Sequence, residues 1–275
     1  MASTQGRCTG DYSLTKEQVE AYHREGFLLI EDFFTPEEHR ELVEICADIR
    51  NWPDTKNKWM QYYERNTVTG EKQLCRSENF TPFHERMREY VFGRRILGVL
   101  AKLNDDMEYV LFKEKINYKL PGGGGFPAHQ DAPAFIQFGQ VTHTTVMFTI
   151  DPTTTENGCL EVVPGSHTLG VLSQEKKDGS INGEWCAQQK WIPVETRPGC
   201  VLIFGAYLAH RSGDNRTANP RTAVYLTYNQ AKEGNLRDHY YEEKRRLFPP
   251  ASDRVKGKDY SQGAAIYNIA TPITE

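Results

Sequence analysis

From about Glu108 onward, hydrophobic residues in this chain recur at every second position. In the segment 108–120, EYVLFKEKINYKL, one face carries Phe112, Ile116, Tyr118 and Leu120, and the other carries Lys113, Lys115, Asn117 and Lys119. This alternation is typical of a strand with two different faces. Further strands are expected at 143–150, 159–163, 200–205 and 222–229, separated by turn clusters such as DPTTTENG and PGSH. No helical period separates them, which disfavours a parallel sheet and favours a jelly-roll or cupin-like sandwich.

The preceding part of the chain carries helix signals. Thr15, with Gln18 three residues later, predicts a capped helix over KEQVEAYHRE, and Thr35 followed by Pro36 opens a second helix. Residues 52–80 are polar and aromatic without a clear period, which predicts a long loop or lid. We therefore expect one α+β domain over 1–275 with a mainly β core: a helical layer at about 13–105, a jelly-roll core at about 106–232 and a C-terminal extension at about 233–275.

Charge narrows the classes of partner. The chain has 33 lysines and arginines against 37 acidic residues, a formal net charge of −4. This balance gives no electrostatic basis for binding nucleic acid or an anionic membrane, so we expect a small-molecule partner. The first 12 residues lack the apolar segment of a secretion signal, and no run of 18 apolar residues occurs. A cytoplasmic monomer or homodimer is the expectation.

Cysteine usage argues against a metal knuckle or a redox pair. The six cysteines, Cys8, Cys46, Cys75, Cys159, Cys186 and Cys200, include no CxxC pair. We expect buried free thiols.

The stretch PGGGGFPAHQDAPAF (121–135) combines four glycines with a possible metal-binding triplet. A phosphate-binding loop would need Gly-Lys-Ser/Thr opening a helix, but Phe126, Pro127 and Ala128 follow Gly125. The glycines are therefore predicted to supply positive φ angles and a close backbone approach.

His129 and Asp131 lie two residues apart, so on an extended segment their side chains point to the same side. Together they provide two of the three ligands of a facial metal triad, if a second histidine joins them. His143, His167 and His210 are the candidates. His143 begins a strand and His167 follows a proline turn, whereas the apolar strand VLIFG would deliver His210 rigidly to the end of the sheet.

Arg221 stands eleven residues after His210, at the start of the next strand. An arginine fork matches a carboxylate through two parallel hydrogen bonds. A metal site with such an arginine suits a metal-chelating dicarboxylate. A zinc hydrolase is an alternative, since zinc also accepts His and Asp, but it does not explain Arg221.

Three segments, KINYKLPGGGGFPAHQDAPAF, DPTTTENGCLEVVPGSH and RPGCVLIFGAYLAHRSGDNRTANPRTAVYLTYN, resemble the phytanoyl-CoA dioxygenase family of iron(II) and 2-oxoglutarate dependent oxygenases. The resemblance covers about residues 14–250 in order. It implies a double-stranded β-helix, a jelly roll flanked by helices, which agrees with the strand pattern.

Carried over by position, the resemblance implies roles for particular residues. The implied iron ligands are His129, Asp131 and His210. The implied contacts of the cosubstrate 2-oxoglutarate are Arg221, Ser212 and Asn117, with Lys113 and Gln130 as further candidates. The implied reaction decarboxylates 2-oxoglutarate to succinate and CO2 and uses O2 to hydroxylate an unactivated C–H bond, with ascorbate as a stimulant. The carboxylate at position 131 implies oxygenation, because related halogenases carry a small residue there.

The substrate is less constrained. Lys113 and Lys115 share a face with Asn117 and either hold an anionic group inside the barrel or extend to solvent at the sheet edge. Arg76, Asn79, Phe135 and Tyr207 are further candidate substrate contacts.

Within the family, KINYKLPGGGG and the downstream YYEEKRRLFPP (240–250) resemble the branch that hydroxylates small anionic or zwitterionic aminophosphonates. The alternatives are a hydrophobic natural product of the meroterpenoid or alkaloid type, an acyl-CoA, and a jelly-roll binding protein without turnover.

Overall fold

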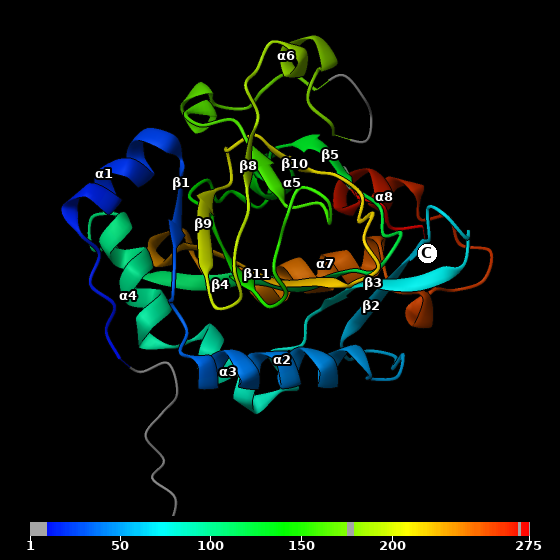
Figure 1. The fold of residues 1–275 in the computed structure, drawn as a ribbon. Helices are drawn as coiled ribbons and strands as arrows, with labels where there is room; N and C mark the ends of the chain where they lie inside the picture. Colours follow the sequence, from blue (N-terminus) through cyan, green and yellow to red (C-terminus); the bar gives the residue numbers. More distant parts are fainter. Residues whose placement is uncertain (1–9, 175–178, 269–270, 275) are drawn as a thin grey trace, which may run out of the picture.

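Two antiparallel sheets pack against each other inside a partial layer of helices (Figure 1). The computed structural model describes residues 10–174, 179–268 and 271–274. The large sheet has the order β1-β9-β6-β11-β4-β3-β2 and the small sheet has the order β5-β10-β7-β8. Leu160 and Val162 of the small sheet share a buried cluster with Met147 and Leu202 of the large sheet, so the two sheets meet face to face. The predicted jelly-roll fold is confirmed.

The strands have the following bounds. The large sheet contains β1 (Phe27–Ile30), β2 (Met60–Arg65), β3 (Lys72–Glu78), β4 (Tyr109–Lys119), β6 (Thr144–Thr149), β9 (Val201–Gly205) and β11 (Arg221–Gln230), and the small sheet contains β5 (Phe126–His129), β7 (Leu160–Val162), β8 (Ile192–Val194) and β10 (His210–Ser212). The strands expected from alternation at 108–120, 143–150, 159–163, 200–205 and 222–229 are therefore all present as β4, β6, β7, β9 and β11.

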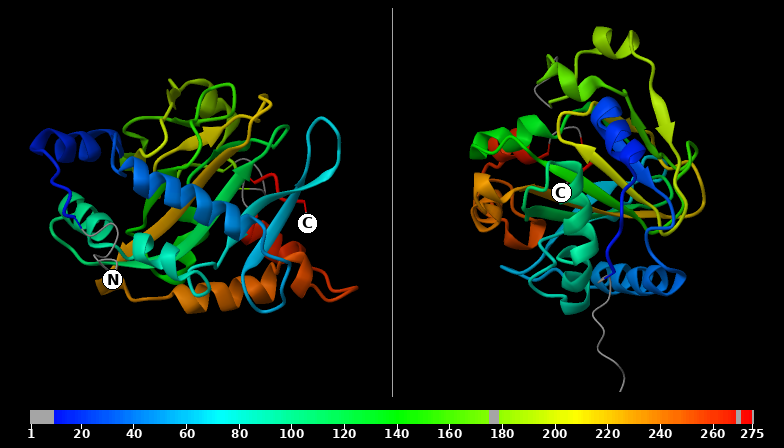
Figure 2. Two further views of the ribbon diagram at one scale, coloured as in Figure 1. Left: turned by 60° about the horizontal axis from the view of Figure 1, so that its bottom comes forward. Right: turned by 90° about the vertical axis from the view of Figure 1, so that its left-hand side faces the viewer.

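Helices cover the outer face of the large sheet and one end of the strands. They are α1 (Lys16–Glu25), α2 (Pro36–Arg50), α3 (Glu85–Val91), α4 (Arg94–Leu103), α5 (Ala132–Phe135), α6 (Gly183–Ala187), α7 (Arg237–Leu247) and α8 (Ser261–Tyr267), with short 3-10 turns at Ile136–Phe138, Ser166–Leu169, Ala231–Glu233 and Ala251–Asp253. The predicted capping boxes of Thr15 and Thr35 are both formed. Figure 2 shows that α7 and α8 (orange and red) lie on a different side of the sheets from α1 (dark blue).

The main hydrophobic core lies between the large sheet and helices α1 to α4. Ile45 and Ile49 of α2 and Leu100 of α4 pack there against Ile116 and Val224 of the sheet. This core fixes one face of β4 and leaves its other face directed at the small sheet.

The prediction of a long loop or lid over residues 52–80 is wrong for Met60–Arg65 and Lys72–Glu78. These segments form β2 and β3, which pair with each other and extend the large sheet through β4. Their buried positions include Gln61, Glu64, Arg76, Ser77 and Glu78. Because polar side chains occupy the interior of these strands, hydrophobic alternation gives no strand signal.

One position of β4 also departs from the expected alternation. Phe112 was expected on the same face as Ile116, but the register with β11 shifts between Thr227 and Tyr228, which pair with Lys113 and Leu111. This bulge leaves Phe112 as the extra residue and directs its ring toward the side of the small sheet, where it packs 5.4 Å from Phe135 between ring centroids.

Five of the six cysteines lie in the described part of the chain: Cys46, Cys75, Cys159 and Cys200 are buried free thiols, and Cys186 is partly buried. Cys8 lies outside the described residues. No helix among the described residues has the length and apolar character needed to cross a membrane.

Candidate active site

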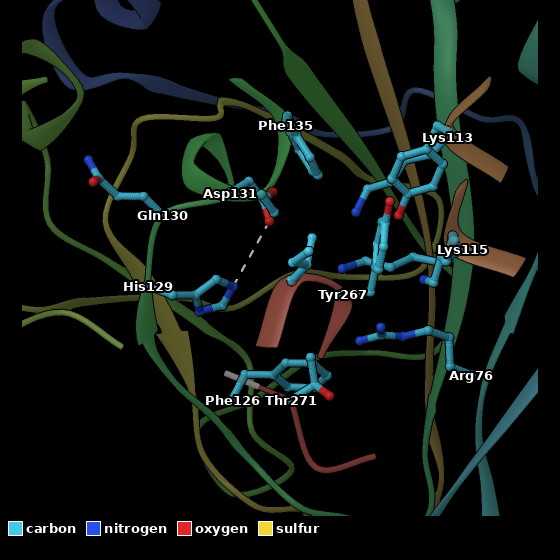
Figure 3. A pocket seen from close by; sticks show the side chains of 14 residues that line it. Arg76, Lys113, Lys115, Phe126, His129, Gln130, Asp131, Phe135, Tyr267 and Thr271 are labelled. Carbon is cyan, nitrogen blue, oxygen red and sulfur yellow. Dashed lines mark ion pairs between the residues drawn. The ribbon is translucent and has the colours of Figure 1, made fainter. Parts of the chain in front are cut away.

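Three side chains converge where strands β5 and β10 of the small sheet are paired. His129 ends β5 and His210 begins β10, and the two residues are paired in the ladder between these strands. Asp131 occupies the N-cap position of α5, two residues beyond His129, and its side chain makes no capping hydrogen bond. One potential ligand atom from each residue lies within 4.8 Å of the other two, and His129 Nε2 lies 4.0 Å from Asp131 Oδ1 (Figure 3). Within the described ranges, this is the one group of three or more such residues with metal-ligating spacing.

Backbone carbonyls fix the tautomer of both histidines. The Nδ1 atom of His129 lies 2.7 Å from the carbonyl oxygen of Pro127, and that of His210 lies 2.9 Å from the carbonyl oxygen of Leu208. A carbonyl can only accept, so each Nδ1 carries the proton and donates it. Each Nε2 therefore keeps its lone pair for a metal ion, in the arrangement typical of ligating histidines.

The electrostatic environment holds all three groups in their ligating protonation states. Burial lowers the pKa of His129 to about 3 and also lowers the pKa of His210. For Asp131, burial alone would raise the pKa, but the neighbouring His210, Lys115 and Lys113 outweigh burial and lower the pKa below its usual range. At neutral pH the site therefore presents two neutral imidazoles and a carboxylate. That donor set fits the two-histidine, one-carboxylate facial triad of non-haem iron(II) oxygenases.

The two other candidate histidines have structural surroundings. The His143 ring packs against Phe112 and Phe135, at centroid distances of 4.7 and 4.9 Å. His167 Nε2 lies 3.1 Å from the carbonyl oxygen of His23. Neither belongs to the cluster around Asp131.

A second group of polar residues lies where β4 and β11 meet the small sheet. Arg221 is paired across the ladder with Lys119, and the Lys119 ammonium donates to Ser212 Oγ at 2.9 Å. The Arg221 guanidinium is buried and donates to the carbonyl oxygen of Gly158 at 2.5 Å, while its Nε is buried without a partner among the described residues. An unpaired donor beside a lysine ammonium fits a carboxylate ligand.

A pocket lies beside the His129, Asp131 and His210 cluster and is partly open to solvent. Its lining residues are Arg76, Lys113, Lys115, Phe126, His129, Gln130, Asp131, Ala134, Phe135, Tyr240, Lys244, Ile266, Tyr267 and Thr271. In Figure 3, Lys113, Lys115 and Arg76 point across the pocket toward His129 and Asp131. The alternative that the two lysines extend to solvent at the sheet edge is wrong, because both face the pocket.

The other expected site residues take several positions. Gln130 reaches the pocket wall but also donates to the carbonyl oxygens of Gly170 and Tyr207 at 2.9 and 2.6 Å, which ties two loops together. Asn117 lies between the two groups and accepts a hydrogen bond of 3.0 Å from Arg76 Nε. Asn79 and Tyr207 are not among the lining residues, and the Asn79 amide donates to the carbonyl oxygen of Lys58 at 3.3 Å.

Sequence reasoning missed Lys119 and the wall supplied by the C-terminal segment. Lys119 shares the face of Asn117 and Lys115, and its pairing with Arg221 was the missing information. Tyr240 and Lys244 come from α7, inside the stretch YYEEKRRLFPP that carried the family resemblance. Tyr267 of α8 has no comparable local signal.

A jelly roll with a buried His–Asp–His centre defines the structural class of the non-haem iron oxygenases. A family model described as "Phytanoyl-CoA dioxygenase (PhyH)" matches residues 22–223. The chain belongs to this family, and the predicted family and dioxygenase class are confirmed.

Individual relatives agree. The chain is 39% identical over 259 residues to a "2-aminoethylphosphonate dioxygenase" of Uncultured bacterium HF130_AEPn_1, covering 94% of this chain and 98% of that protein. It is 39% identical over 236 residues to a "Methylphosphonate hydroxylase" of Gimesia maris, covering 86% and 88%. Among solved structures, EctD from S. alaskensis with 2-oxoglutarate and 5-hydroxyectoine superimposes with a TM-score of 0.68 at 20% identity, covering 84% of this chain and 82% of that one. At that identity the likeness supports the fold alone.

Proposed function

We propose that this protein is an iron(II) and 2-oxoglutarate dependent dioxygenase that hydroxylates a C–H bond of a small phosphonate. The observation that carries the proposal is the opening of the buried His129, Asp131 and His210 cluster onto a pocket lined by lysine and arginine side chains. Two relatives that cover most of this chain are named for phosphonate oxidation.

The residues present fit the cofactors that the family resemblance implies. His129 Nε2, His210 Nε2 and one Asp131 oxygen would hold iron(II) on one face, and Arg221 with Lys119 would hold the distal carboxylate of 2-oxoglutarate. When bound, the iron supplies the activation of O2 that couples decarboxylation of 2-oxoglutarate to succinate with oxidation of the substrate.

The protein's own contribution is to orient and enclose the reactants. Lys113 and Lys115 would attract an anionic substrate, and the rings of Phe135, Tyr240 and Tyr267 would cover its carbon chain. Holding the target C–H bond close to the metal cluster converts a collision into a positioned reaction. The aromatic wall also limits the access of water.

The alternative of a hydrophobic natural product fits the pocket less well. Four cationic side chains line the pocket, whereas an apolar substrate would need an apolar wall. A hydrolase and a binding protein without turnover leave the Arg221 and Lys119 pair unexplained. A cytoplasmic location and a monomeric or dimeric state stay predictions.

The test is succinate release from 2-oxoglutarate by purified protein loaded with iron(II) under nitrogen and then exposed to air. We expect release in the presence of methyl-, ethyl- or 2-aminoethylphosphonate, with a hydroxylated product seen by phosphorus NMR. Asp131→Ala should abolish turnover and lower the bound iron per chain, while Asp238→Ala should preserve both, because the Asp238 side chain is 95% exposed on α7. Absence of succinate with every phosphonate, with no effect of Asp131→Ala on bound iron, would refute the proposal.

A further inference from the structure

We propose that Lys113, Lys115 and Arg76 form a binding site for a phosphonate dianion, separate from the site for the cosubstrate carboxylate on the same strand. The inference rests on the proposed function and names the group by which the substrate is recognised. It distinguishes a doubly charged, tetrahedral head group from a carboxylate.

The geometry of β4 separates the two sites. Lys113, Lys115, Asn117 and Lys119 alternate along the strand on the face directed at the small sheet. Lys119 is paired with Arg221 and hydrogen-bonded to Ser212 at the end of the strand. Lys115 lies four residues away, which is about 13 Å along a strand. The side chain of Asn117 lies between them and is occupied by Arg76.

The charges around the pocket leave a surplus. Glu78 lies behind the wall and accepts from Lys244 Nζ at 2.6 Å and from Arg76 Nη1 at 3.4 Å, so one carboxylate serves two cations. Asp131 is the one carboxylate among the lining residues, and it is a proposed metal ligand. The two positive charges of iron(II) balance the two negative charges of 2-oxoglutarate. The four cations of the wall therefore exceed Glu78 and Asp131 by two positive charges, apart from Lys119 and Arg221 at the cosubstrate site, and a phosphonate dianion suits that surplus.

Of the four cations that line the pocket, Arg76 and Lys244 pair with Glu78, whereas Lys113 and Lys115 have no ion pair among the described residues. In the described part of the chain no carboxylate lies within 4.0 Å of either ammonium, and their close charged-ring contacts are with Phe135 at 4.3 Å and Tyr225 at 5.2 Å. Burial lowers the pKa of both lysines. Such groups cost folding free energy, so a purely structural role does not explain two of them. A bound anion would offset that cost.

Arg76 completes a site suited to three oxygens. The Arg76 guanidinium lines the pocket, with its Cζ atom 5.8 Å from the centroid of the Phe126 ring. Arg76 Nε and Nη1 already donate to Asn117 and Glu78, so Nη2 would meet one oxygen of a tetrahedral group and each ammonium group would meet another. A planar carboxylate has one oxygen fewer and half the charge.

The test measures binding to the iron(II) protein under nitrogen by calorimetry, with 2-oxoglutarate and ethylphosphonate titrated in turn. Lys115→Met and Lys113→Met should each weaken ethylphosphonate about 10- to 100-fold, the range for a charge-assisted hydrogen bond, and change 2-oxoglutarate by less than about 3-fold. Lys119→Met should weaken 2-oxoglutarate binding about 10- to 100-fold and change ethylphosphonate binding by less than about 3-fold. Lys102→Met is the matched control, because the Lys102 side chain is 60% exposed, and it should change neither.

Two further ligands separate charge from shape. The monomethyl ester of ethylphosphonate keeps the tetrahedral phosphorus with one charge, and propionate is a planar monoanion of similar length. Both should bind at least about 10-fold more weakly than ethylphosphonate at pH 8.5, where the latter is a dianion.

The outcomes distinguish this inference from the proposed function. If phosphonates are hydroxylated but Lys113→Met and Lys115→Met leave ethylphosphonate binding unchanged, or weaken 2-oxoglutarate equally, the dianion site is refuted and the proposed function stands. If ethylphosphonate binds with the expected lysine dependence but no phosphonate supports succinate release, the site stands and the proposed function is refuted.

Discussion

Glu78 is a buried carboxylate that joins helix α7 to the wall of the pocket. Its side chain and that of Lys244 are each 2% exposed, and the two groups are 2.6 Å apart. Glu78 also pairs with Arg76 at 3.4 Å. Replacing Glu78 by glutamine leaves both cations without a buried counter-charge, whereas adding Lys244→Met removes one of them again. The double variant should therefore be more stable than the Glu78→Gln single variant.

The magnitude follows from the geometry. Two unit charges 2.6 Å apart attract by about 6 kcal/mol at an effective dielectric constant of about 20, and desolvation offsets much of that. Breaking a buried pair typically costs about 3–5 kcal/mol. We expect Glu78→Gln to lower the free energy of unfolding by that amount, which is about 5–9 °C in Tm for a chain of 275 residues. The double variant Glu78→Gln/Lys244→Met should be more stable than Glu78→Gln alone.

Differential scanning calorimetry of the wild type, both single variants and the double variant gives the coupling energy directly. The matched control is the exposed pair of Glu243 and Arg246 on the same helix, with side chains 31% and 61% exposed, which should couple by less than about 0.5 kcal/mol. Additive effects of Glu78→Gln and Lys244→Met would refute the reasoning. They would mean that each group is stabilised by its surroundings and not by the other.

Three further predictions concern pH, the glycine run and the substrate. Burial alone would raise the pKa of Glu78, but the charges of Lys244 and Arg76 outweigh burial and lower the pKa to about 2. The free energy of unfolding of the wild type should therefore fall by up to about 1.4 kcal/mol per pH unit as pH falls from about 4.3, the ordinary glutamate pKa, toward 2. In chemical denaturation, the free energy of unfolding of Glu78→Gln should fall less steeply over the same pH range. Gly125→Ala would place a Cβ atom 2.6 Å from the Ser212 carbonyl oxygen, so it should push β5 from β10 and lower bound iron per chain, whereas Gly98→Ala in α4 meets nothing within 4 Å and should not. Each of the four aromatic rings lining the pocket already faces a protein cation, so n-propylphosphonate should exceed its isostere 2-aminoethylphosphonate in kcat/KM by about 10-fold or more, and equal values would contradict this.

The sequence predicted those parts of the fold that depend on local chemistry. The capping boxes at Thr15 and Thr35 place hydrogen-bonding groups within one turn, so a few residues decide them. The strands of the jelly roll bury apolar side chains on at least one face, and alternation detects them. His129 and Asp131 were found because a short extended segment fixes their relative directions, and His210 because a rigid strand precedes it.

The remaining features depend on contacts between distant segments. β2 and β3 bury polar side chains such as Glu64 and Arg76, whose partners come from other strands and helices, so their own sequence lacks a strand signal. The bulge that turns Phe112 toward the site appears in the register between β4 and β11 and not in β4 alone. Of the four glycines 122–125, only Gly122 has a positive φ, of 71°, while Gly125 is required by the close approach of Ser212.

The two faces of β4 divide stability from recognition. Ile116 and Tyr118 are buried against the helices in the main core, where apolar burial favours folding. Lys115 occupies the opposite face and has no ion pair within the described ranges, so an apolar side chain there would stabilise the fold more than an amine does. Because the helical side supplies the folding free energy, the other side can hold cations at some cost to stability. Substitutions on the helical face should therefore lower Tm with little change in ligand affinity, and Lys115→Met should weaken ligand binding without lowering Tm.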